Sequence, residues 1–267
     1  MTGIEIGIAS VVLIVVLIYL GMYIPVALGL VSFVGVLIIR GNVDMAVALL
    51  SESIADAVTE FVFATVPLFA LMGLIVSKAG LGKDVYEVAN FVFYRIRGGL
   101  GIATVAANAI FASITGSSIA SASVFTRVAV PEMKRFGFKS RFTVGVVAGS
   151  SVLGMLIPPS AMLIIYSIVT EQSVGQMFVA GIIPGLLLSA AYAALILLMA
   201  YTVPNWVGGM ESKNVADEDW AKMSMWILFK KLFPIVLLIT VVLGGIYGGV
   251  VTPVEAGAMG SLAALII

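Results

Sequence analysis

Long apolar runs, separated by short polar stretches, dominate the chain and predict membrane-spanning helices. The first two runs cover residues 4–20 and 22–39, and each approaches the roughly 20 residues that cross about 30 Å of hydrocarbon. No basic residue precedes the first run, and the second follows at once, so we interpret both as retained spans rather than a cleaved signal peptide. Further apolar runs occupy residues 61–76, 98–130, 142–170, 178–201, 233–247 and 256–267.

Two stretches between these runs are polar or amphipathic. An interlude with acidic and no basic residues follows Arg40. From Leu81 to Ile96, apolar side chains recur at three- and four-residue spacing, with charged and polar residues between them. This second pattern predicts an amphipathic helix that lies along the membrane surface or between other helices rather than crossing the bilayer.

The run over residues 98–130 has the wrong length for ordinary spans. Its 33 residues contain one charge, Arg127. A single straight helix of this length would be about 50 Å long, while two full crossings need about 40 residues and a turn. The middle of the run is rich in small and hydroxyl residues: Thr115, Gly116, Ser117, Ser118, Ser121 and Ser123.

Basic residues flank this run on both sides: Arg95 and Arg97 before it, and Lys134, Arg135, Lys139 and Arg141 after it. The positive-inside rule places both flanks in the cytoplasm. A segment that enters and leaves on one side, with a Gly/Ser tip at mid-depth, is a re-entrant hairpin, and such backbone survives only when buried in protein or lining a wet cavity. Counting spans backwards puts the N-terminus outside, although Arg40 then lies outside too, against the same rule.

The run over residues 142–170 is broken near its middle by the pair Pro158–Pro159. Both prolines remove a backbone donor, and Pro159 keeps Pro158 out of the α region. Small residues precede the pair: Gly149, Ser150, Ser151 and Gly154. We therefore predict two half-helices joined by an unwound piece.

A discontinuous hairpin beside a broken helix is how many secondary transporters form a midplane site, with free carbonyls around a cation and half-helix N-termini facing an anion. Neutral oxygens suit sodium better than a transition metal, and proton coupling usually uses an intramembrane acid, which no apolar run carries centrally. The candidate sodium ligands are the hydroxyls of Ser117, Ser118 and Ser121 and the free carbonyls near Gly149 and Val152. Residues expected in the vicinity of the substrate are Thr115, Gly116, Ser150, Ser151, Pro158, Pro159 and Arg127.

Each feature also has an ordinary structural interpretation. Glycine and serine are common at helix packing contacts, and serine often bonds back to its own helix. The proline pair can serve only as a kink, and Arg127 fits a helix-end residue that snorkels to the interface. The combination of the hairpin, its basic flanks and the broken helix favours a functional site.

Composition narrows the class of protein. The chain is 61% hydrophobic and 10% charged, whereas soluble domains carry about 45–50% apolar and 25% charged residues. Its 14 basic and 14 acidic residues balance, which argues against a nucleic-acid binder. There is no cysteine and no histidine, so disulfides, thiolate or imidazole metal sites and histidine-based catalysis are excluded. We expect neither an enzyme nor an organic cofactor.

Six motifs occur in an order that resembles the large membrane subunit of TRAP (tripartite ATP-independent periplasmic) transporters: residues 114–120 (ITGSSIA), 130–137 (VPEMKRFG), 149–160 (GSSVLGMLIPPS), 165–173 (IYSIVTEQS), 178–185 (FVAGIIPG) and 251–256 (VTPVEA). The resemblance runs through essentially the whole chain. In this family many members carry an acid where the present chain has Ser121.

The resemblance implies an all-α polytopic membrane protein of elevator type in the bacterial inner membrane, with sodium as the coupling ion. It implies a small organic anion as substrate, a carboxylate or sulfonate, delivered by a periplasmic binding protein, and a small membrane subunit as a bracing partner. In the family, the hairpin tip and the broken helix form one sodium site, which here corresponds to Ser117, Ser118, Gly149 and Val152, with Ser121 less closely aligned.

Four segments follow from this resemblance. Residues 1–97 are expected to be scaffold helices with an amphipathic arm, and residues 98–173 the transport domain. Residues 174–231 are expected to be a scaffold helix, a cytoplasmic loop and an arm, and residues 232–267 the start of a second, inverted repeat. Because the last apolar run stops unfinished, we expect the chain to be part of a longer protein and unable to transport alone. The alternative is a membrane scaffold subunit that transports nothing.

Overall fold

The computed structural model of the chain describes residues 3–208 and 224–267. These residues are mainly helical and contain no β-strand. Three of the described helical segments are long and apolar enough to cross a membrane: Phe61–Lys78, Val174–Thr202 and Met225–Tyr247. The bent pair Ser140–Leu156 and Ala161–Val169 makes a fourth if it counts as one span. The predicted class, an all-α polytopic membrane protein, is confirmed.

The chain divides into two compact units, Met1–Glu60 and Phe61–Ile267. The first unit consists of α1 (Gly3–Tyr19), α2 (Ile24–Arg40) and α3 (Val43–Thr59), with α2 packed against both of the others. Helix α3 covers most of the acidic interlude and begins at an Asn42 cap, whose Oδ1 accepts the Asp44 N–H at 2.9 Å. Most apolar side chains of this unit are exposed, as expected for helices that contact lipid or further protein.

The second unit contains the remaining elements: η1 (Phe61–Ala64), α4 (Thr65–Lys78), α5 (Leu81–Phe93), α6 (Gly99–Thr115), α7 (Ser118–Arg135), α8 (Ser140–Ser151), α9 (Leu153–Leu156), α10 (Ala161–Val169), α11 (Val174–Thr202), η2 (Pro204–Trp206), α13 (Met225–Ile239), the π-helix η3 (Thr240–Gly244), α14 (Gly245–Tyr247) and α15 (Pro253–Ile266). The expected boundaries after residues 97, 173 and 231 all fall inside this unit, so the functional partition stays a prediction. Residues 209–223 of the expected cytoplasmic loop lie outside the described residues.

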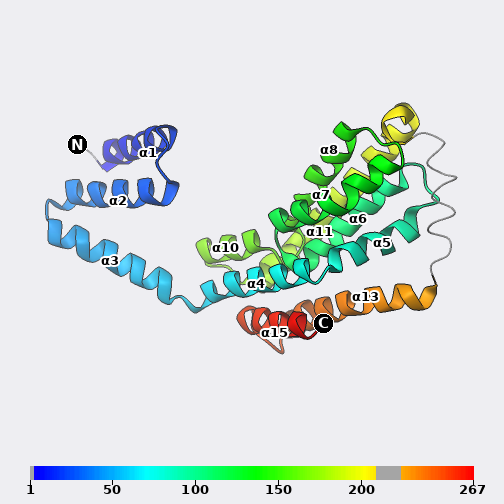
Figure 1. Ribbon diagram of the computed structural model, residues 1–267. Coiled ribbons are helices and arrows are strands. Elements are labelled where there is room, and N and C mark those ends of the chain that lie inside the picture. Colours follow the sequence, from blue (N-terminus) through cyan, green and yellow to red (C-terminus); the bar gives the residue numbers. More distant parts are fainter. Residues whose placement is uncertain (1–2, 209–223) are drawn as a thin grey trace. The chain divides into compact units, whose positions relative to one another are not determined.

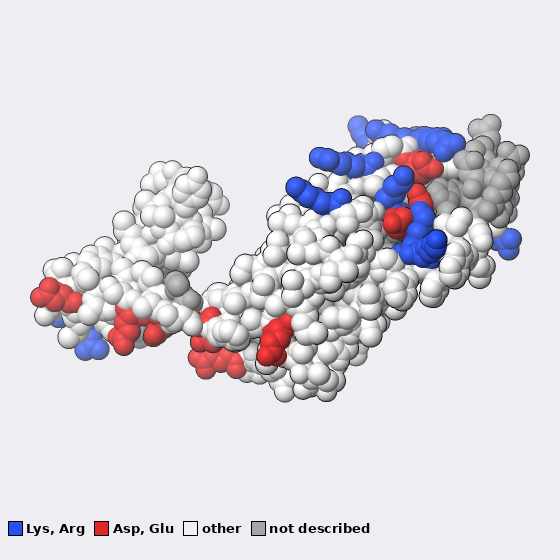
Figure 2. Space-filling view, turned by 60° about the horizontal axis from the view of Figure 1, so that its bottom comes forward, with Lys and Arg blue, Asp and Glu red and all other residues white. Residues whose placement is uncertain are grey.

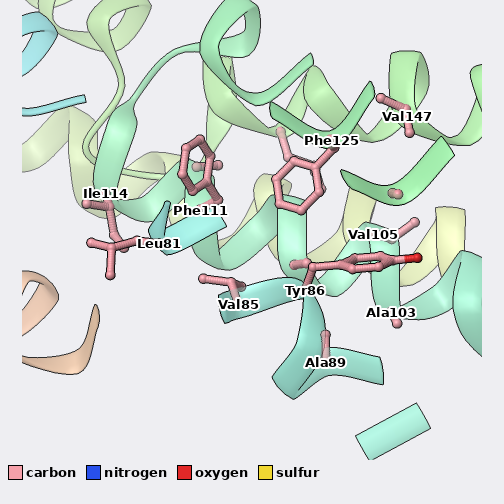
Figure 3. Close-up of a cluster of buried hydrophobic side chains, with 14 of the residues drawn as sticks. Leu81, Val85, Tyr86, Ala89, Ala103, Val105, Phe111, Ile114, Phe125 and Val147 are labelled. Atoms are coloured by element: carbon pink, nitrogen blue, oxygen red, sulfur yellow. The ribbon is translucent and has the colours of Figure 1, made fainter. Parts of the chain in front are cut away.

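Helix α6 is the centre of the second unit, because α4, α5, α7, α8, α9 and α11 all pack against it (Figure 1). Its Phe111 ring meets Phe125 of α7 edge-on at 5.6 Å, and Phe125 meets Tyr86 of α5 at 6.4 Å (Figure 3). All three side chains are almost completely buried. Edge-to-face aromatic pairs add to the stabilisation that burial provides.

The amphipathic helix predicted over residues 81–96 is present as α5. Its apolar face is buried and packs chiefly on α6, while Val92 on the other side is 60% exposed. Helix α5 also contacts α7 and α13. It therefore lies between other helices, which is one of the two placements expected from its pattern.

Charges in the second unit are unevenly distributed. Figure 2 shows Lys and Arg side chains gathered toward one end of this unit. The hairpin explains much of this, because α6 and α7 pack together and join at a tight turn, which brings the basic residues at their far ends to one side. The expectation that both basic flanks share one side of the membrane agrees with this arrangement.

One ionic cluster joins segments that are distant in the sequence. Lys231 of α13 lies 2.8 Å from Asp84 Oδ1 and donates a hydrogen bond to Glu87, both on α5. The three side chains are only 18–33% exposed. Their charges are thus partly withdrawn from water, where an unpaired charge costs more than at a fully exposed surface.

We expect Lys231→Met to lower the free energy of unfolding by about 1–2 kcal/mol, because it leaves Asp84 and Glu87 side by side without their cation. The measurement is the thermal unfolding midpoint of the purified protein in detergent. Lys78→Met is the control, since Lys78 is exposed and forms no ion pair within the described residues. Equal effects of the two substitutions would contradict a bracing role for the cluster.

Candidate functional site

Helices α6 and α7 form the predicted hairpin and are joined by a two-residue turn; its re-entrance into the membrane stays a prediction. Gly116 ends α6 with a φ of 58°, in the left-handed region that glycine adopts without strain. Ser117 then caps α7, its Oγ accepting the Ala120 N–H at 3.3 Å. The Gly/Ser cluster read from the sequence is therefore the tip of the hairpin, as predicted.

The tip is in direct backbone contact with the broken helix. The Ala161 N–H at the start of α10 donates to the Gly116 carbonyl at 3.2 Å. A Cβ on Gly116 would lie 2.4 Å from the Pro159 carbonyl oxygen, and a Cβ on Gly154 would lie 2.8 Å from the backbone of Ser117 and Ser118. Glycine at both positions allows the two chain segments to approach this closely.

The broken helix is also present, and its break falls where the proline pair predicted. Helix α8 ends at Ser151, α9 continues it to Leu156, and α10 begins at Ala161. The two halves, Ser140–Leu156 and Ala161–Val169, are bent by 41°. Between them lies Pro158–Pro159, whose peptide bond is cis, followed by Ser160, which donates to the Met155 carbonyl at 2.7 Å. Hydrogen bonds therefore hold the unwound piece to α9, through Ser160, and to the hairpin tip, through Ala161 at the start of α10.

The carbonyls near Gly149 and Val152 differ from expectation, because they are not free. The Gly149 carbonyl accepts the Val152 N–H at 3.2 Å, and the Val152 carbonyl accepts the Met155 N–H at 2.9 Å. Both bonds span three residues and belong to the tight junction between α8 and α9. Each carbonyl retains a second lone pair, which is what a cation would use.

The predicted serine ligands lie in different environments. Ser117 and Ser118 at the tip are partly buried, whereas Ser121, one turn along α7, is completely buried. The Ser121 Oγ has no hydrogen-bond partner among the described residues. A buried hydroxyl without a partner is costly, so this oxygen has coordination capacity that the protein itself does not use.

The residues expected near the substrate are only partly brought together. Gly116, Pro158 and Pro159 lie at the contact between tip and break, all of them buried. The Thr115 hydroxyl donates to its own helix, to the Phe111 carbonyl, and Ser150 and Ser151 do the same within α8. Arg127 is exposed and lies ten residues beyond Ser117, about 15 Å along α7, so the structure does not place it at the tip.

Sequence reasoning missed Asn108, which connects the hairpin to α8. Its side chain is completely buried in α6, and its Nδ2 donates to Ser150 Oγ at 2.6 Å. Its Oδ1 has no partner among the described residues. The sequence could have indicated this residue, because Asn108 is an amide within the long apolar run over residues 98–130. Burying a polar side chain in a membrane costs free energy, so such a residue often has a function.

Electrostatically the site is a neutral one. The groups that meet there are hydroxyls, backbone carbonyls and backbone amides, and the described part of the chain contains no cluster of three or more acidic residues that could hold a metal ion. Such oxygens can coordinate a hard monovalent cation but offer nothing to a transition metal.

A helical hairpin seated against a broken helix, within a bundle of apolar helices, is an arrangement that many secondary transporters use for a binding site. The chain belongs to the DctM family: residues 11–267 match the family model described as "Tripartite ATP-independent periplasmic transporter, DctM component". This confirms the resemblance read from the six motifs.

Curated relatives agree with this assignment. The C4-dicarboxylate TRAP transporter large permease protein DctM of Pseudomonas aeruginosa is 35% identical over 74% of this chain and 44% of its own length. The sialic acid TRAP transporter large permease protein SiaM of Vibrio cholerae is 30% identical over 81% and 49%. The ectoine/5-hydroxyectoine TRAP transporter large permease protein UehC of Ruegeria pomeroyi is 31% identical over 95% and 57%. The chain spans about half the length of these relatives, and their names as permeases confirm the expectation of a non-enzymatic protein.

The backbone contact at the tip predicts that Gly154 cannot be replaced without a loss of stability. We expect Gly154→Ala to destabilise the protein by about 1–3 kcal/mol, because the added Cβ has to displace the backbone of Ser117 and Ser118. Gly145→Ala in the preceding helix, α8, is the control, since a Cβ there meets nothing within 4 Å. Thermal unfolding of the two variants measures the difference, and a Gly154→Ala protein as stable as the control would show that the tip is not held against α9.

Proposed function

We propose that this chain forms part of the permease subunit of a sodium-coupled secondary transporter that imports a small organic anion. The observation that carries the proposal is the backbone contact between the hairpin tip at Gly116–Ser118 and the broken helix at Gly154–Ala161. Neither segment is continuous helix at that point, and discontinuous helices meeting inside a membrane protein provide the polar backbone that ion and substrate binding require.

Sodium is the proposed coupling ion. Its ligands are the hydroxyls of Ser117, Ser118 and Ser121, with the carbonyls of Gly149 and Val152 contributing through their second lone pairs. The uncompensated Ser121 oxygen supports this assignment, because a bound cation would satisfy a group that the protein leaves without a partner. The absence of any acidic side chain from the tip and the break argues against coupling to protons.

The substrate is proposed to be a small carboxylate or sulfonate that binds beside the sodium. Helices α7 and α10 both begin at this contact, and helix N-termini favour negative charge. Thr115, Gly116, Ser150, Ser151, Pro158 and Pro159 are the proposed residues in its vicinity. The printed names of relatives include C4-dicarboxylate, sialic acid and ectoine, so similarity alone does not choose among substrates.

Family membership supports further assignments for the complete protein. We propose that it lies in the bacterial inner membrane, works with a small membrane subunit and a periplasmic substrate-binding protein, and moves its transport domain as an elevator within the lipid bilayer. Tripartite transport is the description of the matching family. The basic end of the second unit would face the cytoplasm.

The sodium assignment is tested by thermal unfolding of the complete permease in sodium chloride and in potassium chloride at equal ionic strength. At ten times the dissociation constant, sodium binding stabilises the folded state by about 1.4 kcal/mol and raises the unfolding midpoint by several degrees. We expect Ser118→Val to remove this difference, because it replaces the proposed ligand hydroxyl by two methyl groups at the tip.

Ser123→Val is the matched control, since Ser123 lies on the same helix but is exposed. It should retain the sodium-dependent shift. A shift that survives Ser118→Val would place the ion elsewhere. A permease with no preference for sodium, whose substrate uptake needs no sodium gradient, would overturn the coupling. A permease with neither a preference for sodium nor any substrate uptake would favour the alternative of a scaffold subunit.

A further inference from the structure

An apolar groove of about 250 Å³ lies on the second unit, away from the hairpin tip. It is formed where α8 and α11 approach each other over α6, and its walls include Val146, Tyr192, Leu195 and Ile196. Arg141 and Trp206 also line it. We propose that this groove is a binding site for an anionic phospholipid, with an acyl chain between α8 and α11 and the phosphate at Arg141.

The cationic part of the groove is fixed by the turn between α7 and α8. The Lys139 N–H donates to the Trp206 carbonyl at 3.1 Å, and a β-bridge between Phe138 and Val207 holds the same two segments together. The Lys139 ammonium lies 5.4 Å from the centre of the Trp206 ring. Lys139 and Arg141 are therefore presented together at the edge of one apolar surface.

The described residues provide no acidic partner for these two cations. Within the described residues, neither Lys139 nor Arg141 forms an ion pair, in contrast to Lys83, Arg135 and Lys231. Both follow the C-terminal end of α7, in the segment that also carries Lys134 and Arg135. An anion bound there gains charge-assisted hydrogen bonds without breaking an existing ion pair.

Apolar walls with two cations at their edge favour a lipid over a soluble anion as the ligand. A free phosphate would use the cations but leave the apolar walls exposed, and an uncharged chain would fill the walls but leave the cations unpaired. Basic pockets between transmembrane helices bind anionic headgroups, and tryptophan and tyrosine concentrate at the depth where headgroups lie. Trp206 lines this groove, and Arg97 stacks on the nearby Tyr201 of α11 at 5.4 Å.

The test is native mass spectrometry of the complete permease, purified in detergent and exchanged into equal mixtures of phosphatidylglycerol and phosphatidylcholine. We expect the wild type to retain phosphatidylglycerol about fivefold over phosphatidylcholine, the ratio that one basic residue near an anionic membrane supplies. Arg141→Gln should bring that ratio close to one. Lys134→Gln is the control, because Lys134 is an exposed residue of the same basic segment that does not line the groove, and it should keep the wild-type ratio.

A second variant tests the apolar half of the site. Gly145 lines the groove, and a Cβ at this position meets nothing within 4 Å, so we expect the side chain of Gly145→Leu to occupy part of the groove. It should lower retention of both lipids several-fold and leave the unfolding midpoint in lipid-free detergent unchanged. The proposal would be overturned if the wild type retained the two lipids equally, or if Lys134→Gln and Arg141→Gln lost the preference equally. It would also be overturned by normal lipid retention in Gly145→Leu. Binding of glycerol phosphate as strong as that of the lipid would overturn it as well.

Discussion

The close approach of backbone to backbone at the hairpin tip is the contact on which the second unit depends. Two chain segments meet there without intervening side chains, because Gly116 and Gly154 supply the space. The hydrogen bond from the Ala161 N–H to the Gly116 carbonyl pairs a donor and an acceptor where both helices are interrupted. Such backbone groups are costly inside a bilayer when they are left unpaired. Helix α6 can then serve as the packing centre, since its C-terminal end is anchored rather than frayed.

Most other polar groups of this unit are satisfied within their own helices. The hydroxyls of Thr104, Thr115, Ser150 and Ser167 all donate to carbonyls three or four residues earlier, which is how an apolar bundle accommodates them at little cost. Unpartnered oxygens remain on both arms of the hairpin, at Asn108 and Ser121. Buried polar atoms without a partner also occur on α4 and α5, at Thr65, Tyr86 and Asn90. The two on the hairpin are the ones that lie on the arms of the proposed site.

The sequence was sufficient to predict features that depend on a few neighbouring residues. The hairpin followed from the length of an apolar run and from its Gly/Ser centre, and the break followed from Pro158–Pro159, because both depend on backbone geometry that only those residues impose. The Asn108–Ser150 hydrogen bond was not predictable, since it depends on the rotational register between α6 and α8. The bonded carbonyls of Gly149 and Val152 were missed for a related reason: small residues before a proline pair suggested unwinding that starts early, but the helix continues in tightened form to Leu156.

The neutral character of the site bears on how ion and substrate would be coupled. With no fixed charge at the tip or the break, a bound sodium would be the largest local charge, in surroundings of low dielectric constant where its field is weakly screened. An organic anion would then bind more tightly with the ion present than without it, and by linkage the anion would tighten sodium binding by the same factor. An acidic residue in place of Ser121 would weaken this effect, because its own negative charge would neutralise the cation before the substrate arrived. On the proposed function, a hydroxyl at this position therefore keeps the charge of the ion available to the substrate.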